Sequence, residues 1–156
     1  MADLWRAITT GAVSDALPAF FPLNAYVQVK AIPDPTYDWH TRLLDEFDAD
    51  ITAAHDYLGR GAATAKLVSV EVAAPYAAWV SPGYCYNSIG YWHAPGNRLV
   101  YSEDGRIHSI GIASLISWRG EWYVVHLGAV ERPSSGGGVV DDPTPGYGTL
   151  GPPGGC

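Results

Sequence analysis

Charged residues are scarce in this chain, and basic residues are the scarcer kind. Asp, Glu, Lys and Arg make up 16% of the 156 residues, against about a quarter in a typical globular domain. Only 9 residues are Lys or Arg, and the formal net charge is -7. No segment gathers basic side chains into a cluster that could cover phosphates. Nucleic acid is therefore excluded as an expected partner.

Long apolar runs, metal-ligand spacings and catalytic motifs are also absent. No run reaches the roughly 18 apolar residues of a membrane-spanning helix, and the first residues lack the basic-then-apolar order of a signal peptide. The 2 cysteines have no Cys or His at a zinc-ligand spacing. The Gly-rich stretches lie near the end of the chain without a following helix, so they form no phosphate loop or nucleophile elbow. We expect no transmembrane segment, metal, cofactor or motif-defined catalytic residue.

The placement of the two cysteines is informative. Cys85 lies in an aromatic, strand-like run (84–87), and Cys156 ends a tail (133–156) of which more than half is Gly or Pro. Such a tail buries too little apolar area to offset its ordering entropy. A Cys85–Cys156 disulfide would hold it and would place the protein in an oxidising compartment, secreted or in the cell envelope, with a leader or anchor removed. The alternatives are two unrelated thiols in a cytoplasmic protein, or a homodimer bonded through Cys156.

Helical patterns dominate the first part of the chain. Two short helical segments are predicted before residue 20, followed by a strand over 24–32 whose side chains alternate. A long amphipathic helix is predicted over 38–58, because Leu43, Phe47 and Ile51 recur at helical spacing. Its other face carries acids, including Asp48 and Asp50, which we expect to be solvated.

After residue 64 the apolar period changes from helical to alternating. Alternation predicts strands over 65–74, 84–94, 98–102, 106–118 and 121–130. Pro95-Gly96-Asn97 separates two of these strands, while Asp104-Gly105 and Arg119-Gly120 are two-residue turns that join antiparallel neighbours. Helices followed by an antiparallel meander make residues 1–132 one α+β domain, and residues 133–156 its irregular tail.

Several segments carry a resemblance to a known superfamily. The chain opens on a helical Leu4-Trp5-Arg6-Ala7, steps through 19–22 into a strand, continues with a second helix and closes on a hairpin (114–128). In that hairpin Gly120, Trp122 and Val124 give a turn glycine, a Trp and a hydrophobic alternation. Over residues 3–130 the order of elements resembles the nuclear transport factor 2-like superfamily, which includes the SnoaL-like and limonene epoxide hydrolase-like groups. The chain is also similar to actinobacterial extracytoplasmic proteins that end in a Gly/Pro-rich tail with a terminal Cys.

The resemblance implies a cone-like architecture. A bent antiparallel sheet would wrap around the N-terminal helices and leave a pocket between the sheet and the helices. Superfamily members include isomerases, hydrolases and dehydratases that act on hydrophobic small molecules, and also domains without catalysis. The fold alone therefore assigns no activity.

Six residues are candidates to line such a pocket. His55 follows the buried-stripe residue Ile51 by four positions, and His93 and His126 lie on late strands, where imidazole could act as a base or polar anchor. The alternative is that each histidine is a hydrogen-bonded structural residue. The aromatic candidates are Tyr86, Trp92 and Trp118. In a β-rich domain such residues more often serve core and cross-strand packing, which is the alternative for these three.

Three function classes follow. The leading hypothesis is a secreted or envelope-anchored, non-catalytic binding or accessory domain with an aromatic-lined pocket for an apolar small molecule or another protein. The second is a pocket enzyme of the isomerase, hydrolase or dehydratase type. It requires a titrating side chain with an oriented partner. The third is a structural assembly module that would bury its Tyr and Trp residues between chains.

Overall fold

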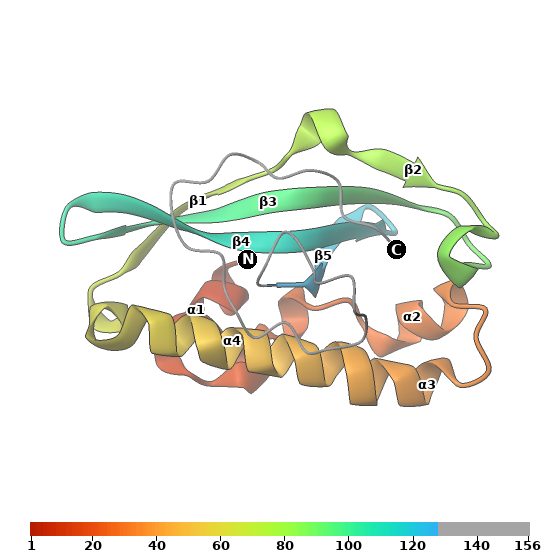
Figure 1. Cartoon of the computed structure of the whole chain (residues 1–156), viewed down its shortest axis with the longest axis horizontal. Coiled ribbons are helices and arrows are strands. Elements are labelled where there is room, and N and C mark those ends of the chain that lie inside the picture. Colours follow the sequence, from red (N-terminus) through yellow and green to blue (C-terminus); the bar gives the residue numbers. More distant parts are fainter. Residues whose placement is uncertain (128–156) are drawn as a thin grey trace, which may run out of the picture.

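The computed structural model describes residues 1–127 and confirms the α+β class. Helices come first in the chain, and a five-stranded antiparallel sheet that is not closed follows them. Figure 1 shows the helices along one face of this sheet. The predicted domain boundary at 132, the tail and Cys156 lie outside the described residues.

The predicted pair of short N-terminal helical segments is confirmed. Helix α1 (Ala2–Thr10) buries Leu4, Trp5 and Ile8 and ends at Gly11, whose φ of 73° closes the last turn. The 3-10 helix η1 (Val13–Ala19) follows, and the left-handed Gly11 separates it from α1.

The predicted strand over 24–32 is wrong, because this segment forms helix α2 (Leu23–Val29). Its buried residues are Ala25, Tyr26 and Val29, which share one helical face, whereas Val27 is 38% exposed. In this short segment the alternating pattern coincided with a helical one. Among residues 24–32, only Lys30 takes part in a described β-bridge, an isolated antiparallel one with Asn87.

The long helix predicted over 38–58 is confirmed, and it begins three residues earlier. Helix α3 (Pro35–Asp38), the π-helical turn η2 (Trp39–Leu44) and helix α4 (Asp45–Leu58) follow one another without a break. Asp34 caps the start by accepting the Tyr37 N–H at 2.9 Å. The prediction that Asp48 and Asp50 lie on a solvated face is wrong: Asp50 is 1% exposed and Asp48 is half-buried.

The sheet has the order β1-β3-β4-β5, and β2 pairs with the same edge of β3 as β1, farther along it. Its strands are β1 (Lys66–Glu71), β2 (Ala78–Val80), β3 (Tyr91–Glu103), β4 (Arg106–Trp118) and β5 (Glu121–His126). Short 3-10 turns connect the helices and the edge strands: η3 (Gly59–Ala63), η4 (Ala74–Tyr76) and η5 (Tyr84–Tyr86).

Two of the predicted strand boundaries are wrong. Pro95-Gly96-Asn97 does not interrupt the sheet, since Pro95 and Asn97 pair with β4 inside the continuous strand β3. The buried Asn97 amide donates to the Ala94 carbonyl (2.7 Å) and accepts from the Ala73 N–H (3.0 Å), which stabilises this stretch. Residues 84–90 are not a strand, because Cys85 (φ 53°) and Tyr86 (φ 55°) have left-handed backbone conformations.

Both predicted hairpin turns are confirmed. Asp104 (φ 48°) with Gly105 (φ 75°), and Arg119 (φ 51°) with Gly120 (φ 88°), have positive φ at both central positions. This conformation matches the twist of the flanking antiparallel strands.

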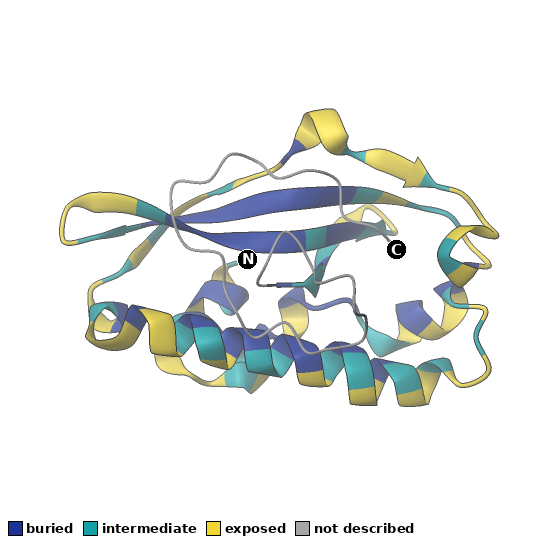
Figure 2. Cartoon of the chain, viewed as in Figure 1, coloured by how far each residue is buried: buried dark blue, intermediate teal, exposed yellow. Residues whose placement is uncertain are grey.

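The core lies between the long helix and the middle of the sheet. Phe20 stacks on Phe47 with ring centroids 4.4 Å apart and also packs against Trp39. The facing sheet residues Leu99, Ile110 and Ile112 are fully buried. Figure 2 shows buried residues on the helix faces turned to the sheet and along the centres of β3 and β4. Beside α2, outside this core, the structure contains a cavity.

Candidate functional site

A cavity of about 440 Å³ lies between α2, the π-helical turn and the end of the sheet where β2 pairs with β3. Its volume is within the range of small-molecule sites. The helical wall consists of Phe21, Tyr26, Val29, Lys30, Arg42 and Leu43. The strands β3 to β5 contribute Tyr91, His93, Ser114, Ile116, Val125 and His126. The outer wall comes from residues 76–85 and includes Tyr76, Trp79, Val80, Tyr84 and Cys85.

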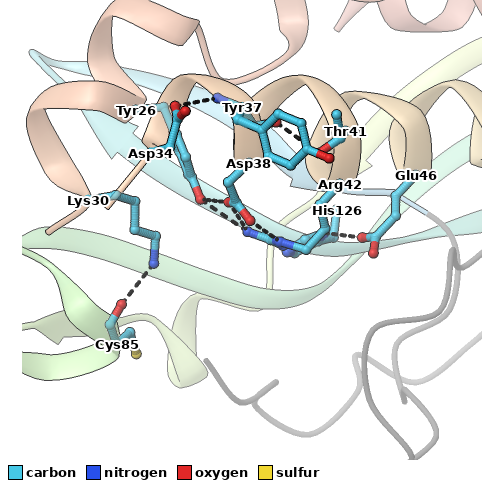
Figure 3. A network of polar contacts seen from close by, with 10 residues as sticks. All are labelled: Tyr26, Lys30, Asp34, Tyr37, Asp38, Thr41, Arg42, Glu46, Cys85 and His126. Atoms are coloured by element: carbon cyan, nitrogen blue, oxygen red, sulfur yellow. Dashed lines mark hydrogen bonds and ion pairs between the residues drawn. The ribbon is translucent and has the colours of Figure 1, made fainter. Parts of the chain in front are cut away.

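The outer wall is held on the end of α2 by hydrogen bonds. The Ala31 N–H donates to the Tyr86 carbonyl, and the Ser88 N–H donates to the Val29 carbonyl, both at 2.7 Å. The Lys30 ammonium donates to the Cys85 carbonyl at 2.9 Å, as Figure 3 shows. These bonds fix the irregular backbone around η5 as part of the cavity.

A polar network supports the helical wall (Figure 3). Arg42 donates from Nε to Asp38 Oδ1 (2.8 Å) and from Nη2 to Asp38 Oδ2 (2.6 Å), and Nη2 also lies 3.0 Å from the Tyr26 hydroxyl oxygen. Tyr26 in turn donates its hydroxyl hydrogen to Asp38. The hydrogen bonds from Arg42 lower the pKa of Asp38, and burial, followed by the bond to Asp38, raises the pKa of Tyr26. At neutral pH Asp38 is therefore ionised and Tyr26 is a neutral donor.

Lys30 is a partly buried cation beside this network. Burial is the main cause that lowers its pKa, and the positive charge of Arg42 lowers it further. The cavity lining thus contains two cationic side chains, Lys30 and Arg42, and no Asp or Glu among the residues that the structure describes.

The two strand histidines that were predicted as site residues both line the cavity. His93 Nε2 and Ser114 Oγ share a hydrogen bond at 2.8 Å, and burial lowers the pKa of His93, so its ring is neutral at neutral pH. His126 lies with Nδ1 3.6 Å from Oε2 of the buried Glu46. A His–carboxylate pair therefore adjoins the cavity, while His93 has a hydroxyl partner.

The other four predicted ligand-binding residues are not among the described lining residues. His55 donates from Nδ1 to the Ile8 carbonyl at 2.8 Å and so connects α4 to α1. Tyr86 is 76% exposed, and Trp92 packs edge-on against Trp79 on the outer surface. Trp118 packs against Phe21 at a centroid distance of 6.4 Å.

Sequence reasoning missed the helical wall, namely Tyr26, Lys30 and Arg42. The misassigned strand over 24–32 hid the four-residue spacing that places Tyr26 and Lys30 one helical turn apart. Pro22, directly before α2, was the available signal for a helix start.

No protein-family model, curated protein or solved structure matches the chain. Within residues 1–127, no helix has the length and apolar character needed to cross a membrane. The same residues contain no group of three or more His, Cys, Asp or Glu side chains placed to hold a metal ion. The site is therefore interpreted from its own geometry.

Proposed function

We propose that this chain is a non-catalytic binding domain that holds a small molecule with a flat, apolar body in the 440 Å³ cavity. The observation that carries the proposal is the composition of the cavity walls. Aromatic and aliphatic side chains, including Trp79 and Tyr91, surround a small number of polar groups from the helices and the sheet. Ligand sites in proteins have this combination of apolar walls and a few orienting polar groups.

The test uses N-phenyl-1-naphthylamine, a neutral fluorescent probe with a flat apolar body. Saturable binding with enhanced fluorescence and a raised melting temperature is expected for the wild-type chain. Ala78→Trp would place a bulky ring at the cavity lining and should weaken binding. Ala74→Trp is the matched control, because Ala74 is exposed and is not one of the described lining residues. No saturable binding to the wild-type chain would overturn the proposal and leave the assembly-module hypothesis.

A second candidate function is a pocket enzyme of the hydrolase or isomerase type. The observation that favours it is the His126–Glu46 pair, because a carboxylate beside an imidazole can orient it and stabilise its protonated form. Hydrolysis of 2-naphthyl acetate or styrene oxide that His126→Asn abolishes and His93→Asn preserves would support this function. Turnover that is unchanged by His126→Asn would exclude His126 as the base.

We also propose membership of the nuclear transport factor 2-like superfamily and an extracytoplasmic location. The helices that precede an open antiparallel sheet and the cavity between them support the superfamily proposal, whereas the strand expected over 24–32 is helix α2. The location proposal depends on the predicted Cys85–Cys156 bond.

A further inference from the structure

The charge of the cavity differs from that of the whole chain. The formal net charge of the protein is -7, whereas the described cavity lining contains Lys30 and Arg42 and no acidic residue. Cationic side chains that face a partly enclosed apolar space attract an anion more strongly than they would in bulk water, because the local dielectric constant is lower.

The two cations are not equivalent. Asp38 neutralises Arg42 through two short hydrogen bonds, so this pair adds no net charge. Lys30 has a single hydrogen bond within residues 1–127, and its acceptor is the uncharged Cys85 carbonyl. An ammonium group has three donors, so two Lys30 N–H groups are available in this part of the structure. Asp38 also interacts electrostatically with Lys30 and raises its pKa, but Lys30, Arg42 and Asp38 together keep an excess of one positive charge, which we assign to Lys30 because Asp38 is bonded to Arg42.

We propose that the ligand is a hydrophobic monocarboxylic acid whose carboxylate binds Lys30 and whose apolar body lies against Trp79 and Tyr91. This inference rests on the proposed binding function. A monoanion matches the single uncompensated charge of Lys30, whereas a dianionic phosphate would exceed it.

Three features of the neighbouring groups support a carboxylate. A bound carboxylate would accept the two available Lys30 donors and offset the unfavourable burial of this ammonium group. Arg42 also lines the cavity, and none of its described hydrogen bonds uses Nη1, so this nitrogen could donate to the same carboxylate. His93 is neutral at neutral pH and is engaged by Ser114, so it adds no competing charge.

The experiment compares 2-naphthoate with its uncharged isostere 2-naphthamide by isothermal titration calorimetry at neutral pH. We expect wild-type protein to bind the carboxylate about tenfold or more tightly than the amide, which is the scale of a charge-assisted hydrogen bond. Lys30→Gln keeps a donor for the Cys85 carbonyl and removes the charge, so it should abolish the preference while amide binding persists. Lys30→Arg should preserve the preference. Lys66→Met, at an exposed position on β1, is the control and should change neither affinity.

The outcomes separate this inference from the proposed function. Equal affinities for acid and amide in the wild-type chain would overturn the carboxylate assignment and leave the binding function intact. Tighter binding of 2-naphthyl phosphate than of 2-naphthoate would overturn the monoanion assignment. A preference for the acid that survives Lys30→Gln would exclude Lys30 as the binding group. Absence of saturable N-phenyl-1-naphthylamine binding to the wild-type chain would overturn the proposed function itself, and this inference with it.

Discussion

Lys30 and Cys85 are 55 positions apart in sequence and are joined by a 2.9 Å hydrogen bond from the Lys30 ammonium to the Cys85 carbonyl. Cys85 and Tyr86 both have positive φ, which is an unfavourable conformation for residues with a side chain. The bonds from the end of α2 to this segment compensate for that cost and hold η5 against the cavity. One lysine therefore serves two purposes, as a support for the outer wall and as the proposed anion-binding group.

The predicted Cys85–Cys156 disulfide can be tested by peptide mapping under non-reducing conditions. A peptide containing Cys85 should be recovered linked to the C-terminal peptide, from protein that is monomeric in solution. The bond would close a loop of roughly 70 residues and stabilise the fold by about 4 kcal/mol on a chain-entropy argument. Dithiothreitol and Cys156→Ser should therefore lower the melting temperature by similar amounts.

Two other results of the mapping have distinct meanings. Two free thiols in folded protein produced under oxidising conditions would contradict the disulfide and remove the support for an extracytoplasmic location. A disulfide-linked dimer would show that Cys156 serves assembly between chains.

Asp38→Asn should destabilise the protein, because it removes the carboxylate that pairs with Arg42 and accepts the hydrogen bond from the Tyr26 hydroxyl. We expect a loss of about 1 to 2 kcal/mol in the free energy of unfolding at pH 7, measured in urea. The folded-state pKa of Asp38 lies below its usual value. Its stabilisation is therefore complete above the unfolded-state pKa, about 4, and is lost as pH falls through the folded-state pKa.

The stability difference between wild type and Asp38→Asn should therefore be smaller at pH 3 than at pH 7. Asp56→Asn is the control on the same long helix, since Asp56 is exposed, and its effect should stay within about 0.5 kcal/mol. A difference for Asp38→Asn that is constant between the two pH values would contradict the assigned ionisation.

The elements predicted correctly are those marked by a repeat over several helical turns or by a specific two-residue turn sequence. Repetition of Leu43, Phe47 and Ile51 over several turns identified the long helix, and Asp104-Gly105 identified a hairpin, because each pattern has one structural solution. The pattern over 24–32 was too short to distinguish period two from a helical face. Part of the cavity wall comes from that segment, so the helical wall was missed. The strand histidines His93 and His126 do line the cavity.

Aromatic composition alone did not locate the cavity wall. Trp79 and Tyr91 line the cavity, whereas Tyr86 and Trp92 lie on the outer surface. The left-handed backbone at Cys85 and Tyr86 reverses the chain there, and a strand-like alternation of side chains cannot anticipate such a reversal.

Gly105→Ala should weaken the β3–β4 hairpin. Gly105 has φ of 75°, and a Cβ atom added there would meet nothing within 4 Å, so the cost arises from the backbone conformation alone. We expect a loss of about 1 to 2 kcal/mol in the free energy of unfolding. Asp104→Asn is the control and should change stability by only a few tenths of a kcal/mol, because Asn adopts positive φ readily. Equal stabilities of Gly105→Ala and wild type would argue against the assigned turn.

Gly90→Ala should perturb the outer wall of the cavity. A Cβ atom at Gly90 would lie 2.4 Å from Trp79 Cζ2 and 2.9 Å from the Val80 carbonyl oxygen, both closer than van der Waals contact. Trp79 must then move, and since Trp79 and Val80 line the cavity, probe binding should weaken several-fold. The strain should also cost about 1 to 3 kcal/mol of stability. Ile89→Ala, at a neighbouring residue that is 42% exposed, is the control and should leave binding of N-phenyl-1-naphthylamine unchanged. Wild-type probe affinity in Gly90→Ala would show that Trp79 does not contribute to the bound state, and it would remove Trp79 from the proposed apolar wall.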